Sequence, residues 1–182
     1  MSEIQPTARP RYSDEPLPPY SYVPGFTPHP VSDPRGHLHG HHATAPPALD
    51  PQHWEDSHAY RYGVDLFNHG FYWEAHEEWE SLWHAAGRRG PVAVWLKALI
   101  KLSAAAVKLR EGNAAGALRH ARRTMELQAE LQVTLPADER TFCGVHLNDA
   151  KEFALLIIGE AEAGLPTSAP TRTLDAWLPL PI

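Results

Sequence analysis

The pattern of apolar and polar residues is clearest between residues 71 and 86, where neither glycine nor proline interrupts the chain. At 100° per residue, the apolar side chains of this segment fall within an arc of about 120°, the width of a core-facing stripe. They are Phe71, Tyr72, Ala75, Trp79, Leu82, Trp83 and Ala86. The opposite side carries Glu74, Glu77 and Glu78. The segment is therefore predicted to be an amphipathic helix, and Gly70 before it can end a preceding helix in the left-handed conformation.

The same pattern predicts four further helices, at residues 51–69, 92–110, 114–132 and 148–163. Pro51 after Asp50 suits the start of the first helix, and Asn148 is a good N-cap for the last. The segment 92–110 is apolar almost all the way round, as expected of a helix in the middle of a bundle. Because the connections are short, consecutive helices should be antiparallel neighbours. The fold class is all-α, a compact antiparallel bundle of about five helices.

The two ends of the chain differ from this bundle. Residues 1–50 contain eleven of the 18 prolines, which exclude long helices, yet they also carry several tyrosines. We therefore expect residues 1–50 to be a Pro/His-rich extended arm lying on the bundle domain, residues 51–165. Residues 166–182 should be an extended tail, with Trp177, Leu178 and Ile182 packed back on the bundle.

Composition narrows the possible environments and partners. The chain has 182 residues, 43% of them hydrophobic, which suits one domain. A net charge of −6 argues against nucleic acid, and no apolar run reaches the roughly 18 residues of a membrane span. One cysteine, Cys143, and no visible signal peptide lead us to expect a cytoplasmic protein. The aromatic content allows a homodimer, without indicating its interface.

His76 and Glu80 are the best candidates for chemistry. Four residues apart, they are neighbours at the edge of the apolar stripe, where imidazole and carboxylate can converge on one divalent metal ion. Glu77 can orient a ligand, act as a base or face water. His-Glu-x-x-Glu lacks the second histidine of zinc proteases, so it carries no protease meaning. The structural alternative is that His76 only hydrogen-bonds Glu80 or a backbone carbonyl.

Two other groups bear on this site. Lys97, Lys101 and Lys108 form the polar stripe of the third helix, and they can either neutralise the glutamates or bind an anionic substrate. The arm contributes a histidine-rich run: His29, His37, His39, His41 and His42. This run is either a compositional feature or the source of a further ligand, in which case His29 or His37 completes a site on the bundle.

A faint internal repeat supports a different function. Gly70, Ala75 and Trp79 match Gly112, Ala117 and Ala121 at a period of 42 residues. Small residues at such positions let paired helices approach closely, as in tetratricopeptide-type hairpins. The alternative function is thus a non-catalytic, tetratricopeptide-like interaction module in which the His-Glu motif is structural.

The central motif also resembles a known family. Its residues are Phe67-Asn68-x-Gly70-x-Tyr72-x-Glu74-Ala75-His76-Glu77-x-Trp79-Glu80-x-Leu82-Trp83, followed by Leu96-x-x-Leu99-Ile100-Lys101-Leu102 and Gly112-Asn113-x-x-Gly116-Ala117. Over roughly residues 60–130 they resemble the small all-helical family called domain of unknown function 309. The resemblance implies a compact helical bundle, and the family is often labelled a predicted metal-dependent hydrolase.

The resemblance also implies a set of site residues. His76 and Glu80 would hold a divalent metal ion, Glu77 would be catalytic, and Tyr72, Trp79 and Trp83 would wall the pocket. Lys101 adds a charged wall where the family resemblance leads us to expect an uncharged or histidine side chain, and Lys108 departs in the same way. The sequence leaves two hypotheses open, a metal-dependent hydrolase and an interaction module.

Overall fold

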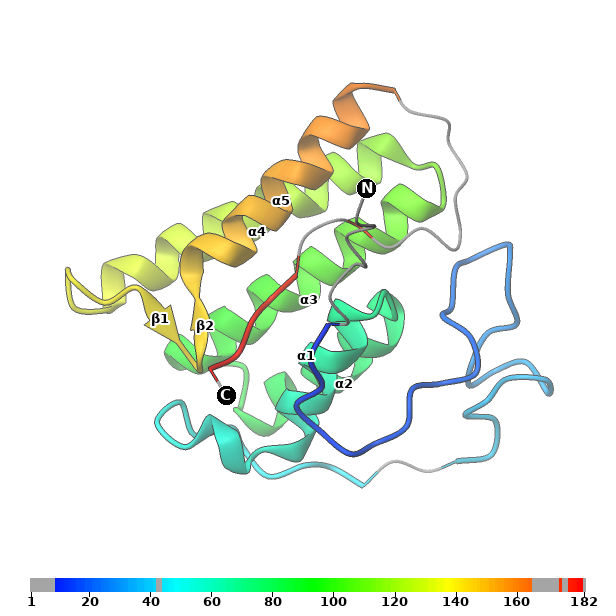
Figure 1. Ribbon diagram of the computed structural model, residues 1–182, viewed down its shortest axis with the longest axis horizontal. Coiled ribbons are helices and arrows are strands. Elements are labelled where there is room, and N and C mark those ends of the chain that lie inside the picture. The colour runs from blue at the N-terminus through cyan, green and yellow to red at the C-terminus, as the bar shows by residue number, and fades with distance from the viewer. Residues whose placement is uncertain (1–8, 42–43, 165–173, 175–176, 182) are drawn as a thin grey trace, which may run out of the picture.

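The computed structural model describes residues 9–41, 44–164, 174 and 177–181, and it confirms an all-α bundle (Figure 1). The five α-helices in this part are α1 (His58–Asn68), α2 (Tyr72–Ala85), α3 (Gly90–Arg110), α4 (Ala114–Thr134) and α5 (Leu147–Glu162). Consecutive helices pack against each other, and α3 contacts α2, α4 and α5. Helix α3, which was predicted to be apolar almost all the way round, therefore lies in the middle of the bundle as predicted. None of the helices in the described ranges combines the length and hydropathy needed to cross a membrane.

Two glycines allow the turn between α1 and α2 and the close packing of the two helices. Gly70 has a φ of +83°, the left-handed conformation expected of it. Gly63 lies under the indole of Trp79, and a Cβ there would be 2.4 Å from Trp79 Nε1. The absence of that Cβ lets α1 approach α2 closely, and Trp79 is buried against Phe67 at a ring separation of 5.6 Å.

The predicted start of the first helix and the predicted N-cap of the last helix are wrong. The first helix begins at His58, with Ser57 as its N-cap, and the chain before it forms only a short 3-10 helix, η1 (Trp54–Asp56). Asp50 instead accepts a hydrogen bond from the Gln52 amide in a turn. The last helix begins at Leu147 behind an N-cap histidine, His146, so Asn148 is not the cap. A small antiparallel hairpin, β1 (Thr141–Phe142) with β2 (Val145–His146), precedes it and was not predicted.

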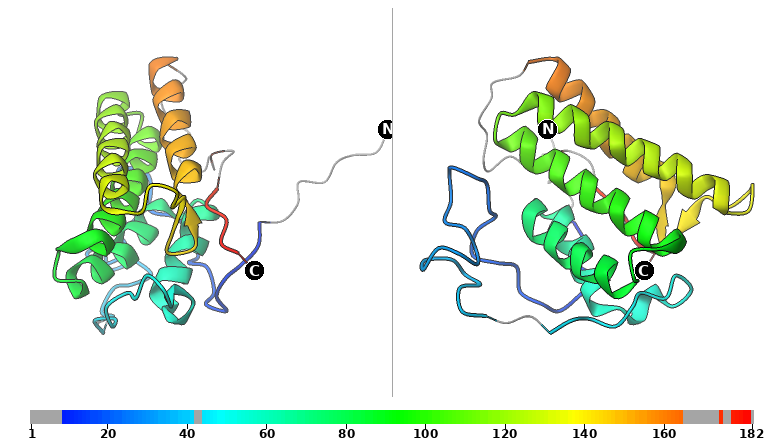
Figure 2. Two further views of the ribbon diagram at one scale, coloured as in Figure 1. Left: turned by 90° about the vertical axis from the view of Figure 1, so that its left-hand side faces the viewer. Right: turned by 180° about the vertical axis from the view of Figure 1, so that it is seen from behind.

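The N-terminal arm lies around α1 and α2, on the side away from α4 and α5 (Figures 1 and 2). The arm is extended over residues 9–22, whereas residues 23–41 form turns with backbone hydrogen bonds such as that from the Asp33 amide to the His29 carbonyl. Two buried carboxylates of the bundle accept bonds from the extended part. Asp65 on α1 accepts from the amides of Tyr12 at 2.7 Å and Ser13 at 2.8 Å. Glu74 on α2 accepts from the Tyr22 amide at 2.8 Å. Glu74 had been assigned to the polar face of its helix, but the arm covers it and it is only 4% exposed.

The C-terminal segment is held in the same way. Asn68 accepts from the Leu178 amide at 2.7 Å and donates to the Leu178 carbonyl at 2.8 Å. The Tyr72 hydroxyl accepts from the Leu174 amide at 3.1 Å. Leu178 is buried as expected, whereas Trp177 is 37% exposed. Ile182 lies outside the described residues, as do residues 166–173 and 175–176 of the predicted tail.

Candidate functional site

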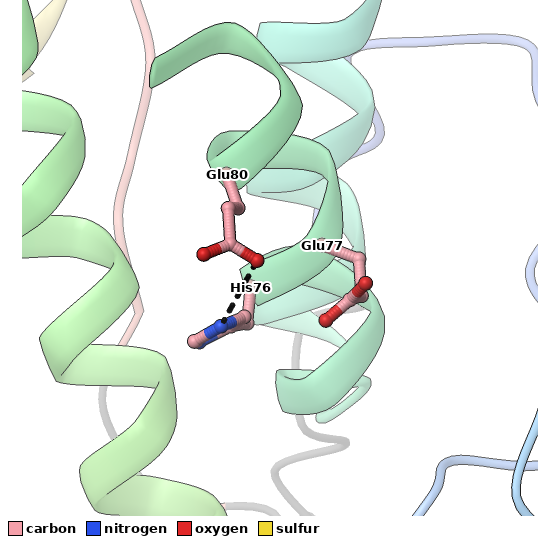
Figure 3. Close-up of side chains that lie close together, drawn as sticks. All are labelled: His76, Glu77 and Glu80. Atoms are coloured by element: carbon pink, nitrogen blue, oxygen red, sulfur yellow. Dashed lines mark ion pairs between the residues drawn. The ribbon is translucent and has the colours of Figure 1, made fainter. Parts of the chain in front are cut away.

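One face of α2 brings together His76, Glu77 and Glu80 (Figure 3). Each offers a ligand atom, and the three atoms all lie within 4.8 Å of one another. His76 Nε2 is 3.9 Å from a carboxylate oxygen of Glu80, one helical turn away. The adjacency predicted from the four-residue spacing is therefore present, with Glu77 further round the same helix.

A contact with α3 determines how the His76 ring is oriented. His76 Nδ1 lies 3.3 Å from the backbone carbonyl oxygen of Ile100. Because a carbonyl only accepts, the Nδ1 nitrogen carries the hydrogen, and in the neutral ring Nε2 keeps its lone pair on the side of Glu80. Ligating histidines in metal sites are commonly held by such a bond to their second nitrogen.

The surroundings disfavour the protonated form of this imidazole. Burial lowers the pKa of His76, and the nearby Lys101 lowers it further, against opposing contributions from Glu80 and the Ile100 carbonyl. Burial raises the pKa of Glu77, and the Glu80 carboxylate raises it further. A neutral imidazole can bind a metal ion, and a carboxylate with a raised pKa is a better proton acceptor near neutral pH.

The three lysines of α3 lie in different surroundings. Lys108 pairs with Glu111 at 2.7 Å, and Lys97 lies over the Trp83 ring at 5.7 Å from its centre. Lys101 lines a pocket of about 80 Å³ together with Glu80 and Trp83. Within the described ranges, none of these lysines forms an ion pair with Glu77 or Glu80. The carboxylates thus remain available to an external cation.

The four residues expected to wall the site fall into two groups. Trp83 and Lys101 line the small pocket beside Glu80. Tyr72 and Trp79 are buried in the core, where Tyr72 packs against Phe67 and Phe153. These two side chains hold α2 against the core and do not line the pocket beside Glu80.

The arm histidines lie elsewhere. His29 packs between Tyr22 and Trp73, with ring separations of 4.9 and 5.2 Å, and His37 packs against Tyr20 at 4.7 Å. Neither joins the group around His76 in the described part of the chain, and His42 lies outside it. The expectation that His29 or His37 completes the site finds no support in this arrangement.

Sequence reasoning missed a larger groove beside the site. Arm residues such as Leu38 and bundle residues such as Trp73, Glu77 and Glu78 line a groove of about 720 Å³. Glu77 therefore faces both the metal-type cluster and this groove. No local pattern in the sequence predicts the groove, because its walls come from segments some 40 residues apart.

Comparison with known proteins identifies one family. Residues 60–120 match the sequence model of a family described as "Domain of unknown function (DUF309)". The matched stretch runs from the first turn of α1 into α4 and contains all three cluster residues. No curated protein matches the chain.

Proposed function

Residues 60–120 of this chain belong to the DUF309 family, and from this premise we propose that the bundle binds a divalent metal ion at His76 and Glu80 and is a metal-dependent hydrolase. The observation that carries the proposal is the orientation of His76. Its Nδ1 is engaged by the Ile100 carbonyl, while Nε2 lies beside a carboxylate that lacks a lysine or arginine partner in the described ranges.

The donor set suits a divalent ion. One imidazole nitrogen with one or two carboxylates is the ligand chemistry of zinc and manganese sites. Both proposed ligands come from a single helix at the protein surface, so several coordination positions are left for water and substrate. When bound, such an ion would supply Lewis acidity and make a water molecule a stronger nucleophile at neutral pH.

Glu77 would act on the proton of that water. Its carboxylate oxygen lies within 4.8 Å of the ligand atoms of His76 and Glu80, within reach of a molecule held between them. Its raised pKa brings it closer to the value that suits a general base. Lys101, beside Glu80, adds a positive charge that favours an anionic substrate group.

The test of metal binding is calorimetric titration of tag-free protein with Zn²⁺ and Mn²⁺. The exposed His39 and His41 are first replaced by alanine, which removes their adventitious affinity. His76→Ala and Glu80→Gln should each weaken binding by more than about tenfold, because even groups that only orient a ligand contribute that much. His84→Ala, on the last turn of the same helix, is the matched control and should bind like the parent. Unchanged affinity in His76→Ala would refute the site.

The test of hydrolysis uses Glu77→Gln. Against p-nitrophenyl phosphate and p-nitrophenyl acetate, the metal-loaded parent should turn over at least one substrate, and the variant should lose about a hundredfold or more. Metal affinity should remain near that of the parent. An equal loss of metal affinity would contradict the role of Glu77 as a base.

A second candidate function rests on a separate observation. Three buried polar side chains near the α1–α2 junction, those of Asp65, Asn68 and Glu74, bind the main chain of extended segments. This is the chemistry of a module that grips a peptide, and here the arm and the C-terminal segment of the same chain occupy it. On this hypothesis the His-Glu motif is structural, so His76→Ala should lower the melting temperature without removing a measurable activity.

A further inference from the structure

The groove between the arm and the bundle has one apolar side and one acidic side. Val31 and Leu38 of the arm face it with Trp73 of α2. Asp56, Glu77 and Glu78 line it from the bundle. Its volume of about 720 Å³ lies within the range of small-molecule sites.

Two histidines, His41 and His58, line the groove together with its three carboxylates. No lysine or arginine is among the residues that line it. None of its three carboxylates takes part in an ion pair in the described part of the chain. Asp56 and Glu77 are exposed and Glu78 is half-buried, so the groove presents a negative potential that would attract a cation.

Trp73 favours the same kind of ligand. Its indole is held in place at the groove by edge contacts with Tyr22 at 5.3 Å and His29 at 5.2 Å. An aromatic face attracts ammonium and guanidinium groups, and also packs against an apolar body. An anion of similar shape would be repelled by the exposed carboxylates of Asp56 and Glu77, and by Glu78 when it is ionised, since burial raises the pKa of Glu78 to about 7.

We propose that this groove binds a small organic cation, an amine carried on an apolar body. Its ammonium group lies between Glu77 and Glu78, and its apolar part packs against Leu38, Val31 and Trp73. The proposal requires no metal ion and goes beyond the proposed hydrolase function, although Glu77 borders both places.

The experiment compares two phenylalkyl ligands of similar size and opposite charge. 2-Phenylethylamine and 3-phenylpropionate are titrated into full-length ¹⁵N-labelled protein in the presence of EDTA, and the indole resonances of the tryptophans are followed. Because EDTA removes metal, the result does not depend on the hydrolase proposal. We expect saturable shifts with the amine, including the Trp73 indole, and none with the carboxylate.

Two variants separate the groove from general electrostatics. Glu78→Gln removes a groove charge and should weaken amine binding about tenfold, the equivalent of one hydrogen bond to a charged group. Glu130→Gln removes an exposed charge on α4 and should bind the amine like wild type. Equal binding of both ligands, no saturable binding of the amine, or equal affinity in Glu78→Gln and wild type would each overturn the proposal.

Discussion

Replacing Asp65 by alanine should release the N-terminal arm from the bundle. The Asp65 carboxylate is 0% exposed and accepts hydrogen bonds from the Tyr12 amide, the Ser13 amide and the Ser13 hydroxyl, at 2.7, 2.8 and 2.6 Å. Arg11 Nε adds an ion pair at 3.1 Å. Alanine removes every acceptor at once, and leaves buried donors that have no partner while the arm stays docked.

The size of the effect follows from the bonds lost. A hydrogen bond to a charged group contributes about 1.5–3 kcal/mol, so the two backbone bonds alone contribute roughly 3–6 kcal/mol. The Arg11 side chain is 32% exposed, and its pair adds no more than about 1 kcal/mol. Undocking lets water satisfy the donors, so the loss is limited to the docking free energy of the arm. A loss of about 3 kcal/mol raises the open population roughly a hundredfold.

Amide hydrogen exchange measures this opening residue by residue. In Asp65→Ala, the amides of Tyr12, Ser13 and Tyr22 should exchange about a hundredfold faster, while those in the centre of α3 keep their protection. Arg11→Ala is the matched control and should change the same rates only slightly. Unchanged arm exchange, or equal acceleration in the arm and in α3, would refute the reasoning.

Two further predictions concern stability. Burial raises the pKa of Glu74 from 4.5 to about 7. The contribution of the protonated Glu74 side chain to the free energy of unfolding is therefore fully present below pH 4.5 and is lost as pH rises through about 7. Urea titrations should show wild type losing up to about 3 kcal/mol between pH 4.5 and 8 relative to Glu74→Gln, and a difference independent of pH would contradict this. Gly63→Ala places a Cβ 2.4 Å from Trp79 Nε1 and should destabilise by about 1–3 kcal/mol. Gly159→Ala, where the space is open, should stabilise by about 0.5–1 kcal/mol, and equal thermal shifts in the two alanine variants would be evidence against the close packing of α1 on α2.

The pattern of apolar and polar residues predicted a helix correctly where residues next to its ends determine where it starts and stops. Helix α2 was expected over 71–86 and spans Tyr72–Ala85, because Gly70 and Gly87 adopt positive φ on either side of it. The first helix was placed too early, since Asp50 and Pro51 form a favourable start in isolation. There the burial of Trp54, whose indole lies against Gly144, accompanies a short 3-10 turn instead of a continuous helix.

The candidate site was predictable only in part, for a related reason. His76 and Glu80 lie on one helix, so their spacing alone brings them together. Glu74 was placed on the polar face because its helix, viewed alone, exposes it. It is buried by Tyr22, 52 residues earlier in the chain, and helical periodicity carries no information about such a contact. The groove was missed because the arm supplies one of its walls.

The bonds between Asn68 and Leu178 join residues that are 110 positions apart, and the Tyr12 hydroxyl accepts from the Leu180 amide across 168 positions. A ribosome adding about 5–20 residues per second makes Leu178 roughly 5 to 20 seconds after Asn68. During that interval the nascent α1 has no partner for its asparagine amide except water. The face of α1 that the C-terminal segment covers therefore stays open until translation has passed residue 180, and chaperones have that long to bind it.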